Sequence, residues 1–166
     1  MIGAIFACDD DWGIGKAGKL PWPKNDADLE WFKKTTMGGV VVMGKTTWDS
    51  LPTSKKPLPG RNNIVVTSSI KDKDGPYHFL TFDQAKTHIL SMSVLQPVWI
   101  IGGAKLFEST IDIIDELWLS KVRGSYNCDT FLPKKEILEK FDQYEHYFDG
   151  TISIEKYRNT NSEAVY

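Results

Sequence analysis

The sequence predicts a single α/β domain, on three observations. Short runs rich in β-branched residues alternate with helix-like segments through most of the chain, which is typical of a sheet whose strands are joined by helices. Towards the C-terminus, two strand-like runs flank Asp149-Gly150, a strong hairpin signal. The length of 166 residues, with 41% hydrophobic and 25% charged residues, suits one globular unit with a sizeable core. We therefore expect one domain over residues 1–166.

Each expected strand is a short apolar run bounded by turn-forming or charged residues. In chain order, the runs are 2–8, 40–43, 63–67, 77–81, 98–101 and 117–122. All are rich in β-branched, aromatic or leucine residues, the types that fit a pleated and half-buried surface. Runs 143–148 and 151–157, joined by the two-residue turn Asp149-Gly150, predict an antiparallel edge.

Four segments between these runs are expected to be helical, at 26–36, 46–51, 83–92 and 104–109. The first and third open with Asp at or near the N-cap, where a carboxylate accepts hydrogen bonds from unpaired N–H groups. Pro and Gly gather at 13–23 and 52–60, which predicts two long loops. Because long loops in compact domains often carry function, both are candidate parts of a site.

Composition excludes several classes of protein. The formal net charge is −2, so no broad basic surface is expected and nucleic acid is not an expected partner. Two cysteines, Cys8 and Cys128, lie far apart in sequence and predict neither a disulfide framework nor a zinc site, which fits a reducing cytoplasm. The run 2–8 ends at three aspartates and does not resemble a signal peptide, and no stretch is long enough for a membrane span.

A glycine motif in the first long loop is misleading. Gly13, Gly15 and Gly18 satisfy G-x-G-x-x-G, but the motif does not directly follow the strand, and Pro21 and Pro23 obstruct a helix after it. A dinucleotide fingerprint needs both contexts. We expect instead a mobile loop across the mouth of an active site, since glycines permit unusual backbone angles.

One carboxylate lies on the apolar face of the first helix. At 100° per residue, Asp28 shares a face with Leu29, Phe32 and Thr36. Asp28 is either an exposed first-turn residue favoured by the helix dipole, or a carboxylate at the floor of an apolar pocket. In the second case it needs charge-assisted donors, which a ligand with an amidine-like pair of N–H groups would supply.

Seven motifs, in one order and spacing across nearly the whole chain, resemble the dihydrofolate reductase family. Each motif alone is weak, but the ordered set is specific. They are Gly13-Ile14-Gly15 with Leu20-Pro21-Trp22, Asp28-Leu29-Glu30-Trp31-Phe32, Val42 to Ser50, Leu58 to Asn63, Val66-Thr67-Ser68-Ser69, Ile100 to Phe107, and Asp129 to Pro133. The short single-domain length is similar to the bacterial or phage type.

The resemblance implies a mostly parallel eight-stranded sheet, about four flanking helices and an antiparallel C-terminal hairpin. It also implies NADPH-dependent reduction of 7,8-dihydrofolate to tetrahydrofolate, by hydride transfer to C6 and protonation of N5, in support of one-carbon metabolism and thymidylate synthesis. A cytoplasmic monomer that binds dihydrofolate and antifolates is expected. Two alternatives remain: a pyrimidine-ribose reductase of riboflavin synthesis on the same fold, and a folate-binding structural component of a virus particle.

The resemblance also assigns the substrate site. Asp28 would hydrogen-bond the pterin ring, Leu20 would cover a proton-donating water, and Trp22 would either hold a water near Asp28 or anchor the loop. Arg61, after the Pro59-Gly60 turn, would bind the folate α-carboxylate with its planar fork. The other expected substrate residues are Ser120, which stands where a Thr commonly bonds the pterin network, and six apolar residues for each of which core packing is the alternative: Ile5, Ala7, Leu29, Phe32, Leu51 and Ile101.

For NADPH, the resemblance points to two strand-to-helix junctions that could bind phosphate at helix starts. Gly102-Gly103, joined by a cis peptide bond in the family, opens one helix, and Gly44 opens the other. Lys45, Thr67 and Ser68 would read the adenosine 2′-phosphate. The remaining expected cofactor residues are Ala7, Ile14, Gly15, Thr46, Thr47, Val66, Ile101, Ala104, Lys105, Leu106, Phe107 and Thr130.

The sequence departs from the family pattern at four of these positions. Lys45 and Lys105 stand where many relatives have Arg, Phe107 replaces a frequent Tyr, and Ser120 replaces a frequent Thr. Lysine supplies charge without a planar fork, so we expect a weaker or more salt-sensitive preference for NADPH over NADH. The sequence shows no cluster of metal ligands and no catalytic histidine spacing.

Overall fold

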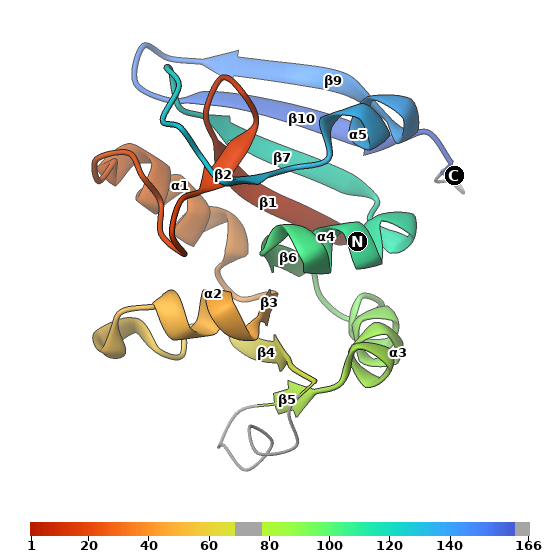
Figure 1. Cartoon of the computed structure of the whole chain (residues 1–166). Helices are drawn as coiled ribbons and strands as arrows, with labels where there is room; N and C mark the ends of the chain where they lie inside the picture. The colour runs from red at the N-terminus through yellow and green to blue at the C-terminus, as the bar shows by residue number, and fades with distance from the viewer. Residues whose placement is uncertain (69–77, 162–166) are drawn as a thin grey trace.

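The computed structural model describes residues 1–68 and 78–161. Its centre is an eight-stranded sheet in the order β5-β4-β3-β6-β1-β7-β10-β9 (Figure 1). The strands are β1 (Ile2–Cys8), β3 (Val40–Gly44), β4 (Asn62–Val66), β5 (His78–Leu80), β6 (Val98–Gly102), β7 (Glu116–Lys121), β9 (Phe141–Phe148) and β10 (Ser153–Asn159). From β5 to β7 all pairs are parallel, whereas β10 is antiparallel to both β7 and β9. The expected mostly parallel sheet with an antiparallel C-terminal pair is confirmed.

Five α-helices are present in the described ranges rather than about four. They are α1 (Asp26–Thr36), α2 (Lys45–Ser50), α3 (Phe82–Met92), α4 (Ala104–Thr110) and α5 (Lys134–Lys140). The first four confirm the predicted helices to within one residue at each end. The prediction missed α5, whose seven residues include one buried side chain, Ile137, and so show no apolar stripe. The structure also has a small antiparallel pair, β2 (Gly13–Gly15) and β8 (Thr130–Phe131).

Strand alternation divides the core into two layers. On β3, Val40 and Val42 belong to one buried cluster, while Val41 and Met43 belong to the other. Successive side chains of a strand point to opposite faces, so the clusters lie on opposite faces of the sheet. The larger cluster includes buried side chains of α3, α4 and α5, and the smaller one includes Trp48 of α2 with Phe32 of α1 packed against it.

The C-terminal hairpin differs from its prediction in one respect. Ser153 pairs with Phe148, so the connection has four residues, 149–152, rather than two. Asp149 Oδ1 accepts hydrogen bonds from the N–H groups of Thr151 (2.8 Å) and Ile152 (2.9 Å), which closes a wider turn. Of the expected strand 77–81, residues 78–80 form β5 and Thr81 is instead the N-cap of α3; Tyr77 lies outside the described residues, as does Ser69.

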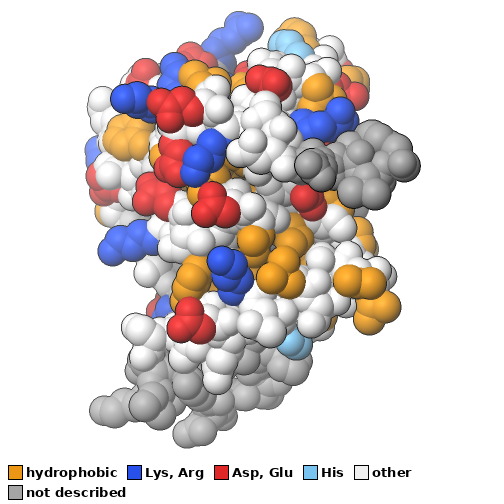
Figure 2. Space-filling view, turned by 90° about the vertical axis from the view of Figure 1, so that its right-hand side faces the viewer, with side chains coloured by type: hydrophobic (Ala, Val, Ile, Leu, Met, Phe, Trp, Pro, Cys, Tyr) orange, Lys and Arg blue, Asp and Glu red, His pale blue; other side chains and the backbone are white. Residues whose placement is uncertain are grey.

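The face turned towards the viewer in Figure 2 carries acidic and basic side chains interspersed, with hydrophobic side chains between them. Exposed apolar residues at the end of α3 and in the turn after it include Leu90, Val94 and Leu95. None of the helices in the described ranges has the length and apolar composition needed to cross a bilayer.

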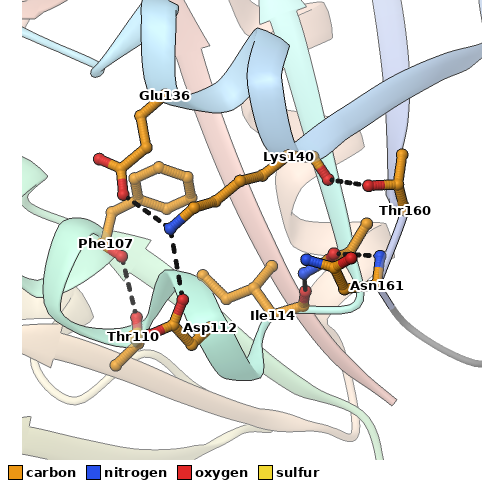
Figure 3. Close-up of polar contacts among 9 residues, drawn as sticks. Phe107, Thr110, Asp112, Ile114, Glu136, Lys140, Thr160 and Asn161 are labelled. Atoms are coloured by element: carbon orange, nitrogen blue, oxygen red, sulfur yellow. Dashed lines mark hydrogen bonds and ion pairs between the residues drawn. The ribbon is translucent and has the colours of Figure 1, made fainter.

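The C-terminal elements are bonded to the turn that follows α4, at Asp112 and Ile114 (Figure 3). Lys140 Nζ of α5 contacts Glu136 Oε1 at 3.0 Å and Asp112 Oδ1 at 3.4 Å. Thr160 Oγ1 donates to the Lys140 carbonyl at 3.1 Å, and Asn159 Nδ2 donates to the Ile114 carbonyl at 2.9 Å. These bonds hold the end of β10 against the rest of the fold.

Candidate active site

The candidate site lies where the parallel strands end. Because β4, β3, β6, β1 and β7 are all parallel, their carboxyl ends meet at one edge of the sheet, where ligands bind in open α/β sheets. The predicted residues Ala7, Gly44, Val66, Ile101 and Ser120 all lie within two residues of these ends. The topology therefore gathers residues from five separate strands.

Asp28 is held at this edge by the start of α1. Asn25 caps the helix by accepting a hydrogen bond from the Asp28 N–H at 3.1 Å, and the Asp28 side chain is 7% exposed. Burial raises the pKa of Asp28 above its ordinary value, and a hydrogen bond with the Ser120 side chain partly offsets this rise. The exposed alternative is wrong: Asp28 is a buried carboxylate, with one protein donor assigned to its side chain.

The apolar residues predicted to line the substrate lie on the same face of the sheet. On β1, Ala4, Phe6 and Cys8 face the larger cluster, so Ile5 and Ala7 face the other side. Ser120 of β7 is the register partner of Ala7. Leu117 and Leu119 of the same strand belong to the larger cluster, so Ser120 faces the opposite side of the sheet, as Ala7 does. Around them, Phe32, Leu51 and Ile101 are partly buried against the smaller cluster. Leu29 is 39% exposed, so it contributes to the surface rather than to the core.

Arg61 is oriented by a short chain of hydrogen bonds. Its Nε donates to the Pro59 carbonyl at 2.9 Å, and one terminal nitrogen donates to Thr36 Oγ1 at 3.2 Å. Thr36 Oγ1 in turn donates to the Phe32 carbonyl at 2.9 Å. Partial burial lowers the pKa of Arg61 from its ordinary value, but arginine stays charged at neutral pH. The guanidinium is thus fixed against the helix that also carries Asp28.

The turn before Arg61 has the conformation that the sequence predicted. Gly60 has φ of 74°, a conformation that favours glycine, and a Cβ there would also lie 2.3 Å from Met37 Sδ, so that side chain would have to shift. The buried Asn63 side chain closes the same loop. Its Oδ1 accepts from the Leu58 N–H at 2.9 Å, and its Nδ2 donates to the carbonyls of Leu58 and Arg61, both at 3.0 Å.

The glycine motif opens no helix, as predicted; it forms a loop and the short strand β2, which the sequence did not predict. Gly18 has φ of 77°, inside a tight turn in which Lys16 and Lys19 exchange two backbone hydrogen bonds. Asp129 holds this turn: its N–H donates to the Gly15 carbonyl at 3.0 Å, and its Oδ2 accepts from the Ala17 N–H at 2.9 Å. Leu20, which directly follows this turn, is 52% exposed. Trp22 is buried, with its ring edge against Tyr126 at a centroid separation of 5.7 Å, as expected of a loop anchor.

The two predicted phosphate junctions lie side by side. A Cβ on Gly44 would lie 3.8 Å from the Gly102 carbonyl oxygen and 3.9 Å from the Gly103 nitrogen. The Gly102-Gly103 bond is cis, as the family resemblance implied. Neither α2, which Gly44 precedes, nor α4, which Gly103 precedes, has a side-chain cap at its start. Two helix starts therefore present backbone N–H groups to one place, which suits an anionic ligand.

Lys45 lies beside the predicted 2′-phosphate residues because Gly44 is in register with Val66. Thr67 is buried and Ser68 is exposed, directly after that strand. Lys45 Nζ contacts Asp49 Oδ1 at 2.7 Å, one helical turn away. An acidic neighbour of the predicted phosphate ligand is a feature that the sequence reasoning did not consider.

A model of the dihydrofolate reductase family matches residues 1–161 of the chain. The chain belongs to the dihydrofolate reductase family. Type 8 dihydrofolate reductase of Escherichia coli is 34% identical over 146 residues, which cover 84% of this chain and 85% of that protein. A bifunctional dihydrofolate reductase-thymidylate synthase of Glycine max is 33% identical over 150 residues, 78% of this chain, and the match spans only 27% of that longer protein.

A solved structure agrees over nearly the whole chain. The dihydrofolate reductase of Enterococcus faecalis, complexed with NADP(H) and RAB-propyl, has a TM-score of 0.81 and 26% sequence identity, and the match covers 97% of both chains. The chain is therefore an oxidoreductase of the dihydrofolate reductase family, and NADPH is the cofactor of that family.

The residues of this chain fit NADPH at the paired junctions. Gly102 has φ of 135°, and a Cβ there would crowd Thr47 Oγ1 at 3.2 Å, whereas a Cβ on Gly103 would meet open space. Thr46 and Lys105 lie in the first turns of α2 and α4, and Thr130 is exposed on β8. No group of three His, Cys, Asp or Glu side chains within residues 1–68 and 78–161 could hold a metal ion.

Some of the predicted cofactor residues are buried or partly buried in the core of this reductase-family fold. Phe107 is fully buried, with its ring edge-on to Phe6 at 5.6 Å between centroids, and Leu106 is 7% exposed. Ile14 and Val66 are partly buried against the same large cluster. A contact of these four residues with the cofactor stays a prediction.

The sequence reasoning missed residues that orient the site of this family member. Thr36 was placed on the right helix face, but its bond to Arg61 depends on a contact between residues 25 positions apart. Asn63 gave a usable signal, since it is an amide directly before the apolar residues of a predicted strand, and the structure shows it buried. Tyr126 gave no signal, and Asp129 was part of a family motif without an assigned role, because only the tertiary fold brings the two residues to the Leu20 loop.

Proposed function

We propose that this protein reduces 7,8-dihydrofolate to tetrahydrofolate with NADPH, which supports one-carbon metabolism and thymidylate synthesis. The observation that carries the proposal is the Asp28 carboxylate, which is 7% exposed, hydrogen-bonded to Ser120 and on the helix whose Phe32 packs against the smaller apolar cluster. A buried carboxylate with capacity for further donors is suited to an amidine-like pair of N–H groups, which the pterin ring presents.

Asp28 orients and polarises the ring in this proposal. Its negative charge, in surroundings of low dielectric constant, favours a positively charged, N5-protonated substrate. NADPH, when bound, supplies the hydride that C6 receives. Asp28 does not need to touch N5, because its field acts over the width of the ring. Ser120 supplies one hydrogen bond to the carboxylate, which leaves capacity for the substrate.

Leu20 and Trp22 control water in the proposed reaction. Leu20 is exposed and free to cover a ligand, while Trp22 is anchored on Tyr126. A single water admitted beneath Leu20 would deliver the proton to N5, and exclusion of other water would strengthen the field of Asp28. The bonds between Asp129 and the loop hold the loop in one place.

Arg61 would bind the α-carboxylate of the folate glutamate. The chain Arg61–Thr36–Phe32 restricts the guanidinium, so little side-chain entropy is lost on binding. Ile5, Ala7, Leu29, Phe32, Leu51 and Ile101 would provide the apolar surface for the pterin and benzoyl rings. Antifolates that present the same donor pair would compete for Asp28.

The N–H groups at the starts of α2 and α4 would hold the cofactor pyrophosphate, with Thr46 and Thr47 as hydroxyl donors. Lys45, Thr67 and Ser68 would contact the 2′-phosphate. Gly15, Ala104, Lys105 and Thr130 complete the proposed cofactor set. Since Asp49 already pairs with Lys45, the 2′-phosphate must compete with a carboxylate.

The protein would act as a cytoplasmic monomer with one domain over residues 1–166. Acidic and basic side chains are interspersed on the face shown in Figure 2, and the net charge is −2, so neither nucleic acid nor an anionic membrane is a proposed partner. The riboflavin-pathway alternative needs no buried Asp28 beside an anchored Arg61, which favours the folate reaction.

The test is to follow NADPH oxidation by the purified protein with dihydrofolate. Parallel reactions contain a pyrimidine-ribose intermediate of riboflavin synthesis or replace NADPH with NADH. We expect turnover with dihydrofolate and NADPH. Turnover with the riboflavin intermediate alone, or binding of folate and NADPH without turnover, would reject the proposal in favour of one of its alternatives.

Asp28→Asn tests the central residue. We expect the single-turnover rate at neutral pH to fall by about 10² or more, the usual scale for assisted proton transfer, because the negative charge beside the pterin is lost. Lower pH should partly restore the rate by protonating substrate in solution. Asp26→Asn, an exposed change in the same helical turn, is the matched control. An unchanged rate and pH profile in Asp28→Asn would contradict the role.

A further inference from the structure

A second buried carboxylate, Asp9, lies outside the proposed substrate and cofactor contacts. Asp9 follows β1 directly and is 1% exposed. Its Oδ1 accepts hydrogen bonds from the N–H groups of Asp11 (3.0 Å) and Gly13 (2.8 Å). Its Oδ2 accepts from the Tyr126 N–H (3.1 Å) and the Cys128 thiol (3.5 Å). One carboxylate thus joins two loops that are more than a hundred residues apart in sequence.

Both loops lead directly to the Leu20 loop. Gly13 begins β2, which continues into Gly15 and Ala17, the residues that Asp129 binds. On the other side, Tyr126 packs against Trp22, and β8 pairs with β2 shortly after Cys128. Apart from the Lys16–Lys19 bonds inside the loop, the protein contacts described above for the Leu20 loop therefore come from residues 126–131, the segment that Asp9 helps to hold.

The packing around Asp9 leaves little freedom for another arrangement. A Cβ on Gly13 would lie 2.5 Å from Cys128 Sγ, so the two loops touch at this point without a side chain between them. Asp10 Oδ2 accepts from the Gly124 N–H at 2.9 Å, and Ser125 Oγ donates to Asp11 Oδ2 at 2.6 Å. These neighbouring bonds are exposed, whereas that of Gly13 to Asp9 is buried.

A carboxylate is the side chain that this place requires. Four donors converge on two oxygens, and an asparagine would replace one acceptor with an N–H₂ group facing donors. Burial alone would raise the pKa of Asp9, but hydrogen bonds from backbone N–H groups and the thiol lower it below its ordinary value. The side chain therefore stays an acceptor for all four donors at neutral pH.

We propose that Asp9 is a positioning residue for the reduction: by fixing the segments 9–13 and 126–131 to each other, it sets the placement of the Leu20 loop over the site without touching substrate or cofactor. The inference rests on the role given to the Leu20 loop under the proposed function. It concerns the step that the loop controls, and not the affinity of Asp28 or Arg61 for substrate.

Asp9→Asn tests the inference with two readouts. We expect the single-turnover rate of NADPH oxidation to fall roughly tenfold, the equivalent of about 1.4 kcal/mol or one hydrogen bond to a charged group, with the Kd for dihydrofolate little changed. Amide hydrogen exchange in the free protein should accelerate at Ala17 and Tyr126. Cys128→Ser, which keeps a donor to Asp9, should retain the single-turnover rate of the unaltered protein. Cys128→Ala should give a rate between that of the unaltered protein and that of Asp9→Asn.

Asp115→Asn is the matched control, because Asp115 Oδ2 accepts a backbone N–H, that of Ile2 at 2.9 Å, at the other end of β1. It should lower stability and leave the single-turnover rate unchanged. An equal loss of rate in Asp115→Asn and Asp9→Asn would overturn the inference, since the effect would then be general destabilisation.

Unchanged amide exchange at Ala17 in Asp9→Asn would also overturn the inference, and this readout does not depend on activity. Faster exchange with an unchanged rate would reject control of the reaction by the loop, whereas absence of any dihydrofolate reduction by the unaltered protein would reject the proposed function alone.

Discussion

At the scale of the residue, Arg61 shows how a mainly exposed side-chain type becomes a precise anchor. Three features act together: the Gly60 turn, the bond to the Pro59 carbonyl and the bond to Thr36. A guanidinium held in this way presents its remaining N–H groups in a fixed plane. Its contribution to binding should therefore exceed that of an unrestrained surface cation.

We expect Arg61→Ala to weaken dihydrofolate binding by about 2 to 5 kcal/mol, the usual cost of truncating one partner of a desolvated charge pair. Titration calorimetry or fluorescence quenching measures the change. Arg61→Lys keeps the charge but lacks the planar fork, so it should give an intermediate loss. A pterin without the glutamate should bind all three proteins equally, and an equal loss for that pterin would argue against the assignment.

The Lys45–Asp49 pair makes a second prediction at this scale. Asp49→Asn removes the carboxylate that contacts Lys45 at 2.7 Å, so NADPH should bind more tightly by up to about 1 kcal/mol, the range of exposed ion pairs. Lys45→Ala should weaken NADPH binding and leave NADH binding nearly unchanged. Both effects should shrink at high salt, because the pair is partly exposed. Kd values for NADPH and NADH at two salt concentrations test this prediction. Tighter NADH binding in Asp49→Asn would contradict the competition between Asp49 and the 2′-phosphate for Lys45.

At the scale of the element, short loops in this protein are held by single buried polar side chains. Asn63 closes the loop from Leu58 to Arg61 with three hydrogen bonds, as Asp9 joins the loops beside β2 and β8. An unmade hydrogen bond inside a protein costs more than a made one contributes, so such a side chain defines one loop conformation. The hydrogen bonds of Asn63 and Asp9, rather than helix or strand propensity, therefore hold these active-site loops in position.

Asn63→Ala should lower the free energy of unfolding by about 1 to 3 kcal/mol, since it leaves buried backbone groups unpaired. It should also weaken dihydrofolate binding, because Arg61 loses its support, while NADPH binding changes little. Urea unfolding and the two ligand titrations test both parts. Asn62→Ala, at the neighbouring position, makes none of these bonds and serves as the control. Equal losses for the two ligands would show a general effect on the fold instead.

At the scale of the whole molecule, two buried aspartates act on stability in opposite directions. Asp28 has a raised pKa, so its ionised form opposes folding at neutral pH, and this penalty disappears as the pH falls below the ordinary Asp pKa. Asp9 has a lowered pKa, so it stabilises the fold above the ordinary Asp pKa and loses that effect as the pH falls through its folded value. A residue kept at a cost to stability is typical of a functional site.

Urea unfolding at neutral pH and at about pH 3, below the ordinary Asp pKa, tests these signs. Asp28→Asn should be more stable than the unaltered protein at neutral pH, and the gain should fade at acid pH. Asp9→Asn should be less stable at neutral pH, with the loss fading at acid pH. If the free energy of unfolding changed in the same direction in both variants at neutral pH, the direction of the pKa shift would be wrong for at least one of the two carboxylates.

The sequence by itself determined the α/β sheet, four of the five described α-helices, the position of Asp28 on the apolar face of the first helix and the Gly60 turn, whereas the burial of Asp28 was decided only by the structure. Each depends on local pattern: strand composition, helix periodicity, an unusual residue on an apolar face or a glycine where φ is positive. Only the tertiary structure decided the bond from Ser120 to Asp28, the contact of Thr36 with Arg61, the approach of Gly44 to Gly102-Gly103 and the four donors around Asp9. Apart from the Asp11 and Gly13 N–H groups beside Asp9, these contacts join residues distant in sequence, so no local window contains both partners. For the same reason α5 escaped prediction: its one buried side chain, Ile137, becomes part of the core only when the fold places it there.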